Sequence, residues 1–489
     1  MKKHNNFRKP ILPTLLAVQL AGCMVGPDYQ KPKTDPGPGF ANAQQPEFQT
    51  QGIEGAWWKQ FKDPRLVKLI ELAVLNNRDL KAAEANLRQA RALFLDAGLD
   101  LFPHITTHAN YTDQHRSFDS LNRRNFVPRD LKLYNTGFDA AWEVDIFGRI
   151  RRNIEAQEAN IEAAEADRRA LLVSVVSEVA RNYFELRGHQ NQLYVAQKNA
   201  ENQTHTVELT QERLDAGVGT SLDTARAKAQ LNTTLATVPP IDSLIHQDVH
   251  RIGVLTGQLP AALADELLKP EPIPPIPDLV QIGKPAELLR RRPDIRAAER
   301  QLASATASIG VITADLFPRV SFNGTFALEA QSFTGLGSAG SGAYSFGPRI
   351  TWAALNLGQV YARIRAADAS AEASLAQYEQ TVLSALEETE NALVNYNRVR
   401  ERQVLLTSAA AESLEAYRLA HLRFDDGVEN FLTVLDTEKR LLEDQRDLAQ
   451  SQTATATTLV ALYKALGGGW EEFGIPQADL PEAERLFSP

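Results

Sequence analysis

Several features that mark other classes of protein are missing from this chain of 489 residues. It holds one cysteine, Cys23, so no disulfide can form within the chain. It has no long apolar run, and its mean hydropathy is −0.29, so the sequence predicts no membrane-spanning helix. The formal net charge is −9, which argues against nucleic acid as a partner.

Motifs for catalysis and metal binding are also missing. No His-Glu-x-x-His, Gly-x-Ser-x-Gly or phosphate-binding loop occurs, and the nine histidines lack the spacing of metal ligands. Gly335, Gly337 and Gly340 formally match a dinucleotide fingerprint, but a strand pattern follows them instead of a helix, which indicates a plain loop. We therefore expect a protein that is not an enzyme and holds no metal or free cofactor.

Proline and glycine are scarce in two long stretches. Between Gly148 and Gly217 there is no proline, and the only glycine is Gly188. Between Gly358 and Gly427 there is neither proline nor glycine. Each stretch predicts a helix about 100 Å long, at ~1.5 Å per residue. Before each stretch, apolar residues alternate with small or polar ones, which predicts a strand with one apolar face that ends at Gly148 or Gly358. These apolar positions include Tyr134, Phe138, Trp142, Val144 and Ile146, and in the second stretch Tyr344, Phe346, Ile350, Trp352 and Ala354.

The two stretches are copies of one unit. A constant offset of 210 residues matches Trp142 with Trp352, and the skeleton Arg-x-Asp-x-Gly-Val at 213–218 with the same skeleton at 423–428. Each copy is expected to contain a helix, a β-hairpin, a long helix and a return helix. The chain then divides into a lipoprotein signal peptide at 1–22, an extended arm at 23–62, a first repeat at 63–256, a proline-rich linker at 257–285, a second repeat at 286–466 and a tail at 467–489.

Local signals place the helix ends of the first repeat. Asp63 is a good cap, and one helix is expected to run from it to Leu101, where Pro103 ends it. Ser221 is expected to cap the return helix after the turn at Gly217. Pro239-Pro240 should interrupt that helix.

The N-terminus has the layout of a bacterial lipoprotein signal. Basic residues at 2–9 precede a short apolar run at 11–21, which Leu20-Ala21-Gly22-Cys23 follows. Cleavage before Cys23 and a covalent lipid on its sulfur are therefore expected.

The strands predict an assembly of several chains. Each repeat supplies two strands of about ten residues, the length that crosses a bilayer. Four strands cannot close a barrel, and an open sheet in lipid would leave edge N–H and C=O groups unpaired at several kcal/mol each. In the first long helix, apolar residues follow the 4-3 spacing of a coiled-coil seam: Leu172, Val176, Val179, Tyr183, Leu186 and Leu193. Together these patterns favour a helical tube joined to a shared barrel.

With these motifs the chain resembles the TolC-like outer-membrane efflux proteins, in their lipoprotein NodT-type branch. The resemblance rests on Leu-Ala-Gly-Cys at 20–23, Trp57-Trp58, the Leu-Phe-Pro stops at 101–103 and 316–318, and the two glycine turns. It implies a homotrimer of mainly long helices with a 12-stranded transmembrane barrel, four strands per chain, continued by a periplasmic α-helical barrel. It further implies a passive exit duct in the outer membrane that meets a periplasmic adaptor and an inner-membrane pump. Met24 after Cys23 favours the outer membrane.

The resemblance also implies roles at the periplasmic tip. Gly217, Val218, Gly427 and Val428 would form the tip turns and dock the adaptor, with the two glycines at positive φ. By position, Asp223 and Asp436 match acidic residues that hold the aperture or line it. Phe424 stands where the family pattern has a tyrosine that donates through its hydroxyl, a group that Phe lacks. Glu429 stands where the pattern has an arginine that pairs with an acidic residue, and Glu would repel Asp223 instead.

Some alternatives stay open at the level of sequence. Closure of the tip could rest on apolar contacts of Phe424, Phe431 and Leu432, or on Arg423 pairing with a carboxylate. A lipid-anchored structural coiled coil and a periplasmic lipoprotein enzyme are the competing classes of protein. Drugs, metal ions, lipids and oligosaccharides are all possible cargo.

Overall fold

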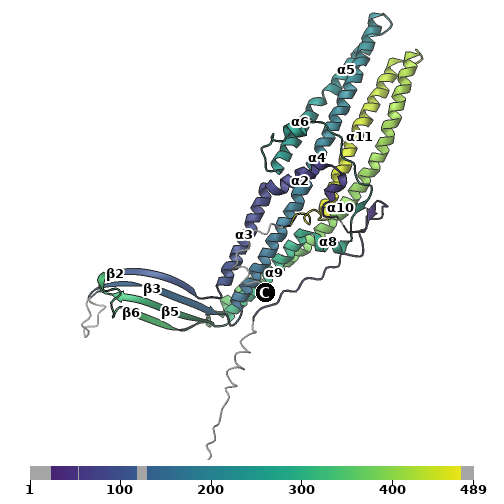
Figure 1. The fold of residues 1–489 in the computed structure, drawn as a ribbon. Coiled ribbons are helices and arrows are strands. Elements are labelled where there is room, and N and C mark those ends of the chain that lie inside the picture. The colour runs from purple at the N-terminus through teal and green to yellow at the C-terminus, as the bar shows by residue number, and fades with distance from the viewer. Residues whose placement is uncertain (1–23, 53, 118–128, 475–489) are drawn as a thin grey trace, which may run out of the picture.

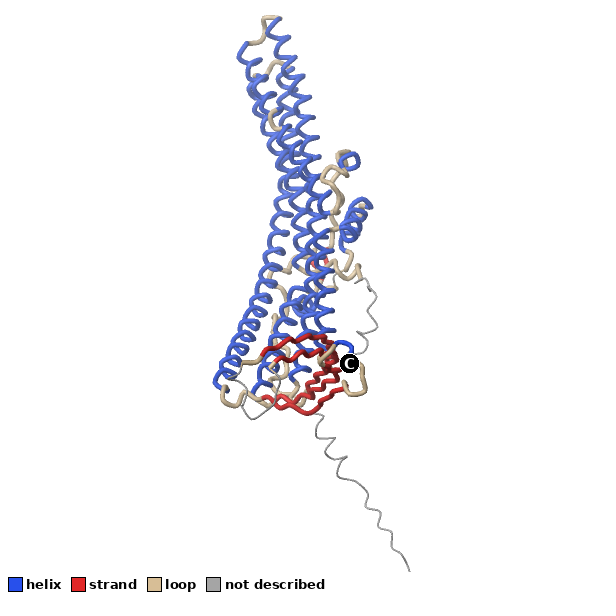
Figure 2. Tube along the Cα trace, turned by 90° about the vertical axis from the view of Figure 1, so that its left-hand side faces the viewer, coloured by secondary structure: helices blue, strands red, loops and turns tan. Residues whose placement is uncertain are grey.

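A computed structural model describes residues 24–52, 54–117 and 129–474 of the chain. Four strands form a sheet at one end, and long helices run from it to two hairpin tips at the opposite end (Figure 1). The turned view shows the helices lying side by side along this length, with the strands gathered below them (Figure 2). The signal peptide, Cys23 and residues 475–489 lie outside the described residues. Among the described residues, no helix is both long and apolar enough to cross a membrane.

Both repeats have the expected order of elements. After the short strand β1 (Phe48–Gln49) and the 3₁₀ helix η1 (Trp57–Phe61), the first repeat contains α2 (Pro64–Asn76), α3 (Arg78–Leu99), β2 (His104–His115), β3 (Asp130–Val144), α4 (Arg149–Asp215), α5 (Ser221–Leu235) and α6 (Val238–Leu255). The linker carries α7 (Ala264–Leu267) and β4 (Val280–Gln281). The second repeat contains α8 (Pro285–Arg291), α9 (Pro293–Thr313), η3 (Ala314–Leu316), β5 (Arg319–Ala330), η4 (Phe333–Gly335), β6 (Gly342–Thr351), α10 (Leu357–Asp425) and α11 (Phe431–Ala465).

The sheet is open at both sides. Its strands lie in the order β2-β3-β5-β6, and every neighbouring pair is antiparallel. The register places Phe138 opposite Phe326, and Phe326 opposite Tyr344, so that one face is rich in aromatic side chains. These side chains are exposed in the single chain. Strands β2 and β6 each leave one edge without a partner strand among the described residues.

The structure corrects three predicted boundaries in the first repeat. The expected helix from Asp63 to Leu101 is two helices, because Asn77 leaves the helical conformation with a ψ of 133° and its side chain caps α3 by accepting from the backbone N–H groups of Asp79 and Leu80. The cap of α5 is Thr220, not Ser221, which is the first helical residue. The predicted interruption near Pro239-Pro240 is present, since α5 ends at Leu235, but the next helix begins at Val238 and carries both prolines in its first turn, where their missing N–H groups cost no helical hydrogen bond.

The junctions between strands and long helices also differ from prediction. Strand β3 ends at Val144, before Ile146, and the Asp145 carboxylate accepts from the N–H groups of Ile150 and Arg151 at the start of α4. Gly148 has a φ of +79° between the two elements. In the second repeat the strand ends at Thr351, and Gly358 is already in the first turn of α10. The predicted strand stop at Gly358 is therefore wrong.

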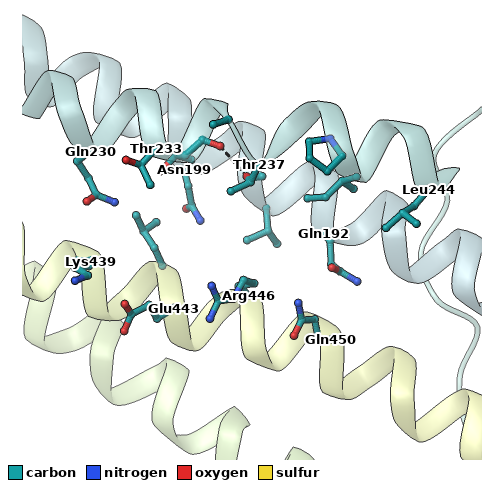
Figure 3. A pocket seen from close by; sticks show the side chains of 17 residues that line it. Gln192, Asn199, Gln230, Thr233, Thr237, Leu244, Lys439, Glu443, Arg446 and Gln450 are labelled. Carbon is teal, nitrogen blue, oxygen red and sulfur yellow. Dashed lines mark hydrogen bonds between the residues drawn. The ribbon is translucent and has the colours of Figure 1, made fainter.

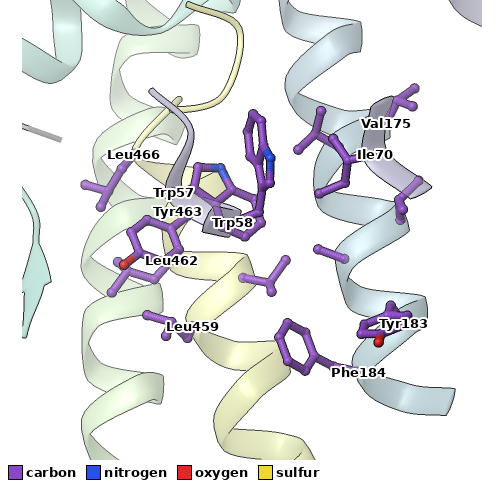
Figure 4. Packing of buried hydrophobic residues seen from close by; sticks show 14 of the residues in the cluster. Trp57, Trp58, Ile70, Val175, Tyr183, Phe184, Leu459, Leu462, Tyr463 and Leu466 are labelled. Atoms are coloured by element: carbon purple, nitrogen blue, oxygen red, sulfur yellow. The ribbon is translucent and has the colours of Figure 1, made fainter. Parts of the chain in front are cut away.

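The core lies where the two repeats meet, around the middle of α4 and α10, and Figure 4 shows part of it from close by. Trp57, Trp58 and Phe61 are almost fully buried there. The Trp57 ring stacks on Tyr463 of α11 at 4.9 Å, and Phe61 contacts Phe184 of α4 at 4.7 Å between ring centroids. Each buried aromatic side chain contributes roughly 1.5–3 kcal/mol by leaving water. The segment before the first helix thus joins α4 to α11.

The arm before η1 is extended, as predicted, and follows the helices closely. It begins beside the junction of sheet and helix, where Val25 donates its N–H to the Phe147 carbonyl at 3.2 Å. The buried Arg152 donates to the Val25 carbonyl and to the Asp28 carboxylate. Further along, β1 pairs in parallel with β4 of the linker. The arm therefore spans the distance from the sheet to the core.

Candidate functional site: the two hairpin tips

The two tips have the same backbone geometry. Gly217 and Gly427 have φ values of +75° and +71°, which confirms the predicted left-handed conformation. The N–H of Val218 donates to the Arg213 carbonyl at 3.0 Å, and the N–H of Val428 donates to the Arg423 carbonyl at 2.9 Å. These bonds satisfy carbonyls at the ends of α4 and α10, the usual way in which a glycine stops a helix.

Each tip presents an apolar surface to its surroundings. Val218 is 69% exposed and Val428 is 66% exposed, and Leu222 and Leu432 beside them are also exposed. Neighbouring apolar side chains that project from the end of a molecule are typical of a protein–protein contact. The docking residues expected from the sequence therefore lie at the ends of the two hairpins, open to a partner. They are Gly217, Val218, Gly427 and Val428.

Phe424 lies between the hairpins and is not exposed at an opening. Only 7% of it is exposed, and its ring packs against Phe431 with 5.5 Å between centroids. The Arg213 guanidinium of α4 lies 4.6 Å from the centre of the same ring. A small cluster around it contains Ala227, Ala420, Phe424, Phe431, Val434 and Leu435. The apolar contact between Phe424 and Phe431 thus occurs within one chain, whereas Leu432, the third residue named for apolar closure, is exposed.

Arg423 pairing with a carboxylate is present as well. Its guanidinium lies 3.6 Å from Glu429, which also accepts from the Thr433 hydroxyl at 3.0 Å. Asp223 makes a local contact, since its carboxylate accepts from the Thr220 hydroxyl at 2.7 Å while its N–H donates back to that oxygen. Neither acidic side chain reaches the other hairpin by a hydrogen bond or ion pair among the described residues.

A hollow of about 200 Å³ brings part of the predicted set together. Its lining comes from both tips: Thr210, Arg213, Val218, Gly219, Asp223, Phe424, Glu429, Asn430 and Phe431. Asp436 is not in this lining and lies exposed on α11. The structure therefore places Val218, Asp223, Phe424 and Glu429 around one hollow and leaves Asp436 on a separate surface.

Further from the tips, a groove of about 600 Å³ separates the hairpins. Figure 3 shows α11 on one side and the region of α4, α5 and α6 on the other. Asn199 and Gln192 of α4 lie across from Lys439, Glu443 and Arg446 of α11. The hairpins are thus joined at the tip cluster and at the core, and are separated in between. No group of three or more His, Cys, Asp or Glu side chains in the described parts of the chain is arranged to hold a metal ion.

One notable side chain near the tip was missed by the sequence reasoning. Glu438 is 3% exposed, and its Oε2 has no hydrogen-bond partner among the described residues. It lies in α11 between Val434 and Leu441, both of which are buried. The signal was available, because Phe431, Leu435, Glu438 and Leu442 follow the 4-3 spacing of a coiled-coil seam with one charge among apolar residues.

Comparison with known proteins agrees with this architecture. The chain is 32% identical over 471 residues to the solvent efflux pump outer membrane protein SrpC of Pseudomonas putida. The match covers 94% of this chain and 98% of that relative. It is 30% identical over 460 residues to nodulation protein T of Rhizobium leguminosarum bv. trifolii, covering 92% of this chain and 95% of that one.

Solved structures show the same fold. The outer-membrane channel OprN gives a TM-score of 0.84 at 43% identity, over 92% of this chain and 100% of that chain. The open state of the MtrE outer membrane channel of Neisseria gonorrhoeae gives a TM-score of 0.79 at 28% identity, over 92% and 99%. The family model described as outer membrane efflux protein matches residues 69–258 and 285–468, one segment in each repeat. The chain therefore belongs to the outer membrane efflux protein family.

Proposed function

We propose that three copies of this chain form a passive exit duct in the outer membrane. The observation that carries the proposal is the open sheet, with exposed aromatic side chains on one face and an unpartnered edge on β2 and on β6. An apolar face turned to lipid requires every edge N–H and C=O to be paired, which closure with further strands achieves. Three copies of four strands give a 12-stranded barrel, and the helices of the three copies continue it as a tube.

The duct works with other proteins and supplies no energy of its own. The family and relatives named as outer membrane components of efflux pumps support a periplasmic adaptor and an inner-membrane pump as partners. The exposed apolar side chains at the tips support adaptor docking at Val218 and Val428. Because the duct is passive, no side chain needs a catalytic role, and no cofactor beyond a covalent lipid is part of the proposal.

The lipid anchor on Cys23 fits the start of the arm. Met24, the first described residue, packs against Gly148 at the junction of the sheet and α4, near the end of the strands. Acyl chains attached there would enter the same bilayer as the barrel, at ~0.8 kcal/mol per buried CH₂. Mass spectrometry of the mature protein is expected to find Cys23 acylated and N-terminal. An unmodified Cys23 in the mature chain would contradict the anchor.

Reconstitution tests the channel. The purified full chain is expected to run as a trimer in native mass spectrometry and to conduct ions across a planar lipid bilayer. A structural coiled coil or a periplasmic enzyme would give no stepwise conductance. A monomer without conductance in lipid would overturn the proposal.

Site-specific cross-linking to the adaptor tests docking. Val218→Asp and Val428→Asp together should abolish the cross-links, because charges then replace apolar contacts. Leu259→Asp is a matched control, since Leu259 is 80% exposed but lies in the linker, away from the tips. Docking at the tips is wrong if the double variant cross-links as well as the control does.

A further inference from the structure

The second face of the sheet is polar and carries its own side-chain network. The register places Thr106 opposite Asp139, and His108 opposite Gly137, on the face away from Phe138. On β5 the same face carries Thr325 and Glu329, opposite Asp139 and Asn135. If the aromatic face meets lipid, as the proposed function requires, this polar face lines the water-filled interior.

One chain of hydrogen bonds crosses three strands on that face. The Thr325 hydroxyl donates to Asp139 at 2.8 Å, and Asp139 lies 2.7 Å from Nδ1 of His108. Nε2 of His108 lies 2.5 Å from Oδ1 of Asn135, whose amide nitrogen donates to Glu329 at 2.8 Å. The imidazole therefore bridges two carboxylate-bearing ends of one network.

This geometry determines how many protons His108 carries. Glu329 accepts only, so the Asn135 amide must turn its NH₂ to that carboxylate and its oxygen to His108. Nδ1 of His108 faces a carboxylate oxygen and Nε2 faces an amide oxygen, and both of these atoms are acceptors. Both ring nitrogens must then donate, which only the imidazolium form does. The network is complete only when His108 is charged.

The charges around the imidazole set the effect of losing its proton. Together, His108, Asp139 and Glu329 carry one net negative charge per chain when the imidazole is protonated. They carry two when it is neutral. Arg349 is the charged residue on the polar face of β6, the strand that a neighbouring copy would place beside β2. His104 also lies on this face, two residues before Thr106 on β2. It has no carboxylate partner among the described residues. Histidine is the side chain whose charge changes most readily between pH 5 and 8.

We propose that His108 determines the ion selectivity of the channel. Asp139 and Glu329 of the three copies form a ring of carboxylates inside the barrel, the carboxylate girdle, and protonated His108 neutralises part of its charge. This inference rests on the proposed function, because three copies must enclose the polar face for the girdle to surround the path of ions. Loss of the imidazolium proton raises the negative charge of the girdle and breaks one hydrogen bond of the network. Cation selectivity is therefore higher with the neutral imidazole than with the imidazolium.

Reversal potentials in a salt gradient across a planar bilayer test this. The unmodified trimer should become more cation-selective from pH 5.5 to pH 8. In a His104→Gln background, which removes the other histidine of the polar face, His108→Gln should keep the high selectivity at both pH values, because it carries no charge. His108→Lys should keep the low selectivity at both, because it stays charged. The two variants therefore bracket the unmodified channel.

Two other histidines serve as controls. His115 forms a comparable pair with Asp130, 2.5 Å away, at the far end of the same two strands, and His104 lies on the polar face without such a partner. His115→Gln and His104→Gln should each retain the pH dependence of selectivity. If His108→Gln and His108→Lys conduct as trimers and shift with pH as the unmodified channel does, the role of His108 is wrong. Absence of any conductance in the unmodified trimer would contradict the proposed function instead.

Discussion

The guanidinium of Arg213 lies over the ring of Phe424, 4.6 Å from its centroid, and so links the first hairpin to the second at their tips. A cation over an aromatic face contributes about 0.5–1 kcal/mol where exposed and about 2 kcal/mol where water is excluded. Phe424 adds the burial of its own ring against Phe431. Opening of the tips by movement of one hairpin relative to the other has to separate this contact.

Weakening the contact should therefore open the channel. Phe424→Ala is expected to raise single-channel conductance and to lower the stability of the tip by about 3 kcal/mol, the usual cost of removing a buried aromatic ring. Arg213→Ala should have a smaller effect in the same direction. Arg398→Ala is the control, because Arg398 is an exposed arginine with a local ion pair to Glu401 on the same helix. Conductance of Phe424→Ala equal to that of the control would show that the contact does not hold the tip closed.

Glu438 predicts a pH dependence of the second hairpin. Burial raises the pKa of its carboxyl from 4.5 to about 7, and the charge of nearby His421 opposes this shift. The apolar side chains that α4 and α5 contribute to the tip cluster around Phe424 and Phe431 include Val207, Leu209 and Ala227, and Arg213 of α4 lies over the Phe424 ring. The folded state thus holds the proton more tightly than the unfolded state. The hairpin is at full stability below pH 4.5 and loses it as the pH rises towards 7.

Glu438→Gln should remove this loss. At pH 8 the variant is expected to be more stable than the unmodified protein by up to ~3 kcal/mol, since each unit of pKa shift corresponds to about 1.4 kcal/mol. At pH 4.5 the two proteins should melt alike. Asp444→Asn is the contrasting variant, because the Asp444 carboxylate is bonded to Ser413 and Arg440 and its removal should destabilise. Thermal unfolding in detergent at both pH values tests this. If Glu438→Gln loses as much stability between pH 4.5 and pH 8 as the unmodified protein does, the buried carboxyl is not the cause of the loss.

The turn glycines give a prediction that separates backbone strain from crowding. A Cβ at Gly217 or Gly427 would meet no atom within 4 Å, yet both residues have positive φ. Alanine at either position should therefore cost about 1–2 kcal/mol through the left-handed backbone alone. Gly340→Ala is the control, since a Cβ there also meets open space but φ is ordinary. Equal melting temperatures for all three alanine variants would exclude the strain.

The repeat, the strands, the long helices and the glycine turns could be predicted because each rests on a local or periodic signal. Trp142 and Trp352 donate matching hydrogen bonds to the carbonyls of Leu101 and Leu316, and the family resemblance is confirmed. The break at Asn77 was missed, since neither proline nor glycine marks it and the apolar period continues across it. Thr220 was missed as a cap because Ser221 beside it is an equally good candidate by residue type.

Tertiary contacts within the candidate site could not be predicted in the same way. Arg213 and Phe424 lie over 200 residues apart in the chain, and nothing local in either segment indicates that one will cover the other. The pairing of β1 with β4 involves two residues on each side, too few to show a period. The network around His108 depends on the register between β2, β3 and β5, which the alternation of each strand alone does not determine.

The last prediction concerns the acidic residues of the tips. Asp223 is bonded to Thr220, Glu429 is paired with Arg423, and Asp425 lies 3.0 Å from His421. Asp436 is exposed and forms no hydrogen bond or ion pair with the described residues. If α11 lines the opening, three copies of Asp436 would surround it, attract cations and repel anions, and salt would weaken the effect.

Asp436→Asn is therefore expected to lower the cation selectivity of the channel, most clearly at low ionic strength. Asp426→Asn is the matched control, because Asp426 lies at the end of α10 on the turn itself and should face the surroundings. The effect of Asp436 should persist at pH 8 in a His108→Gln background, since the two groups act at opposite ends of the duct. Reversal potentials that stay the same in Asp436→Asn at every salt concentration would show that this carboxylate does not line the opening.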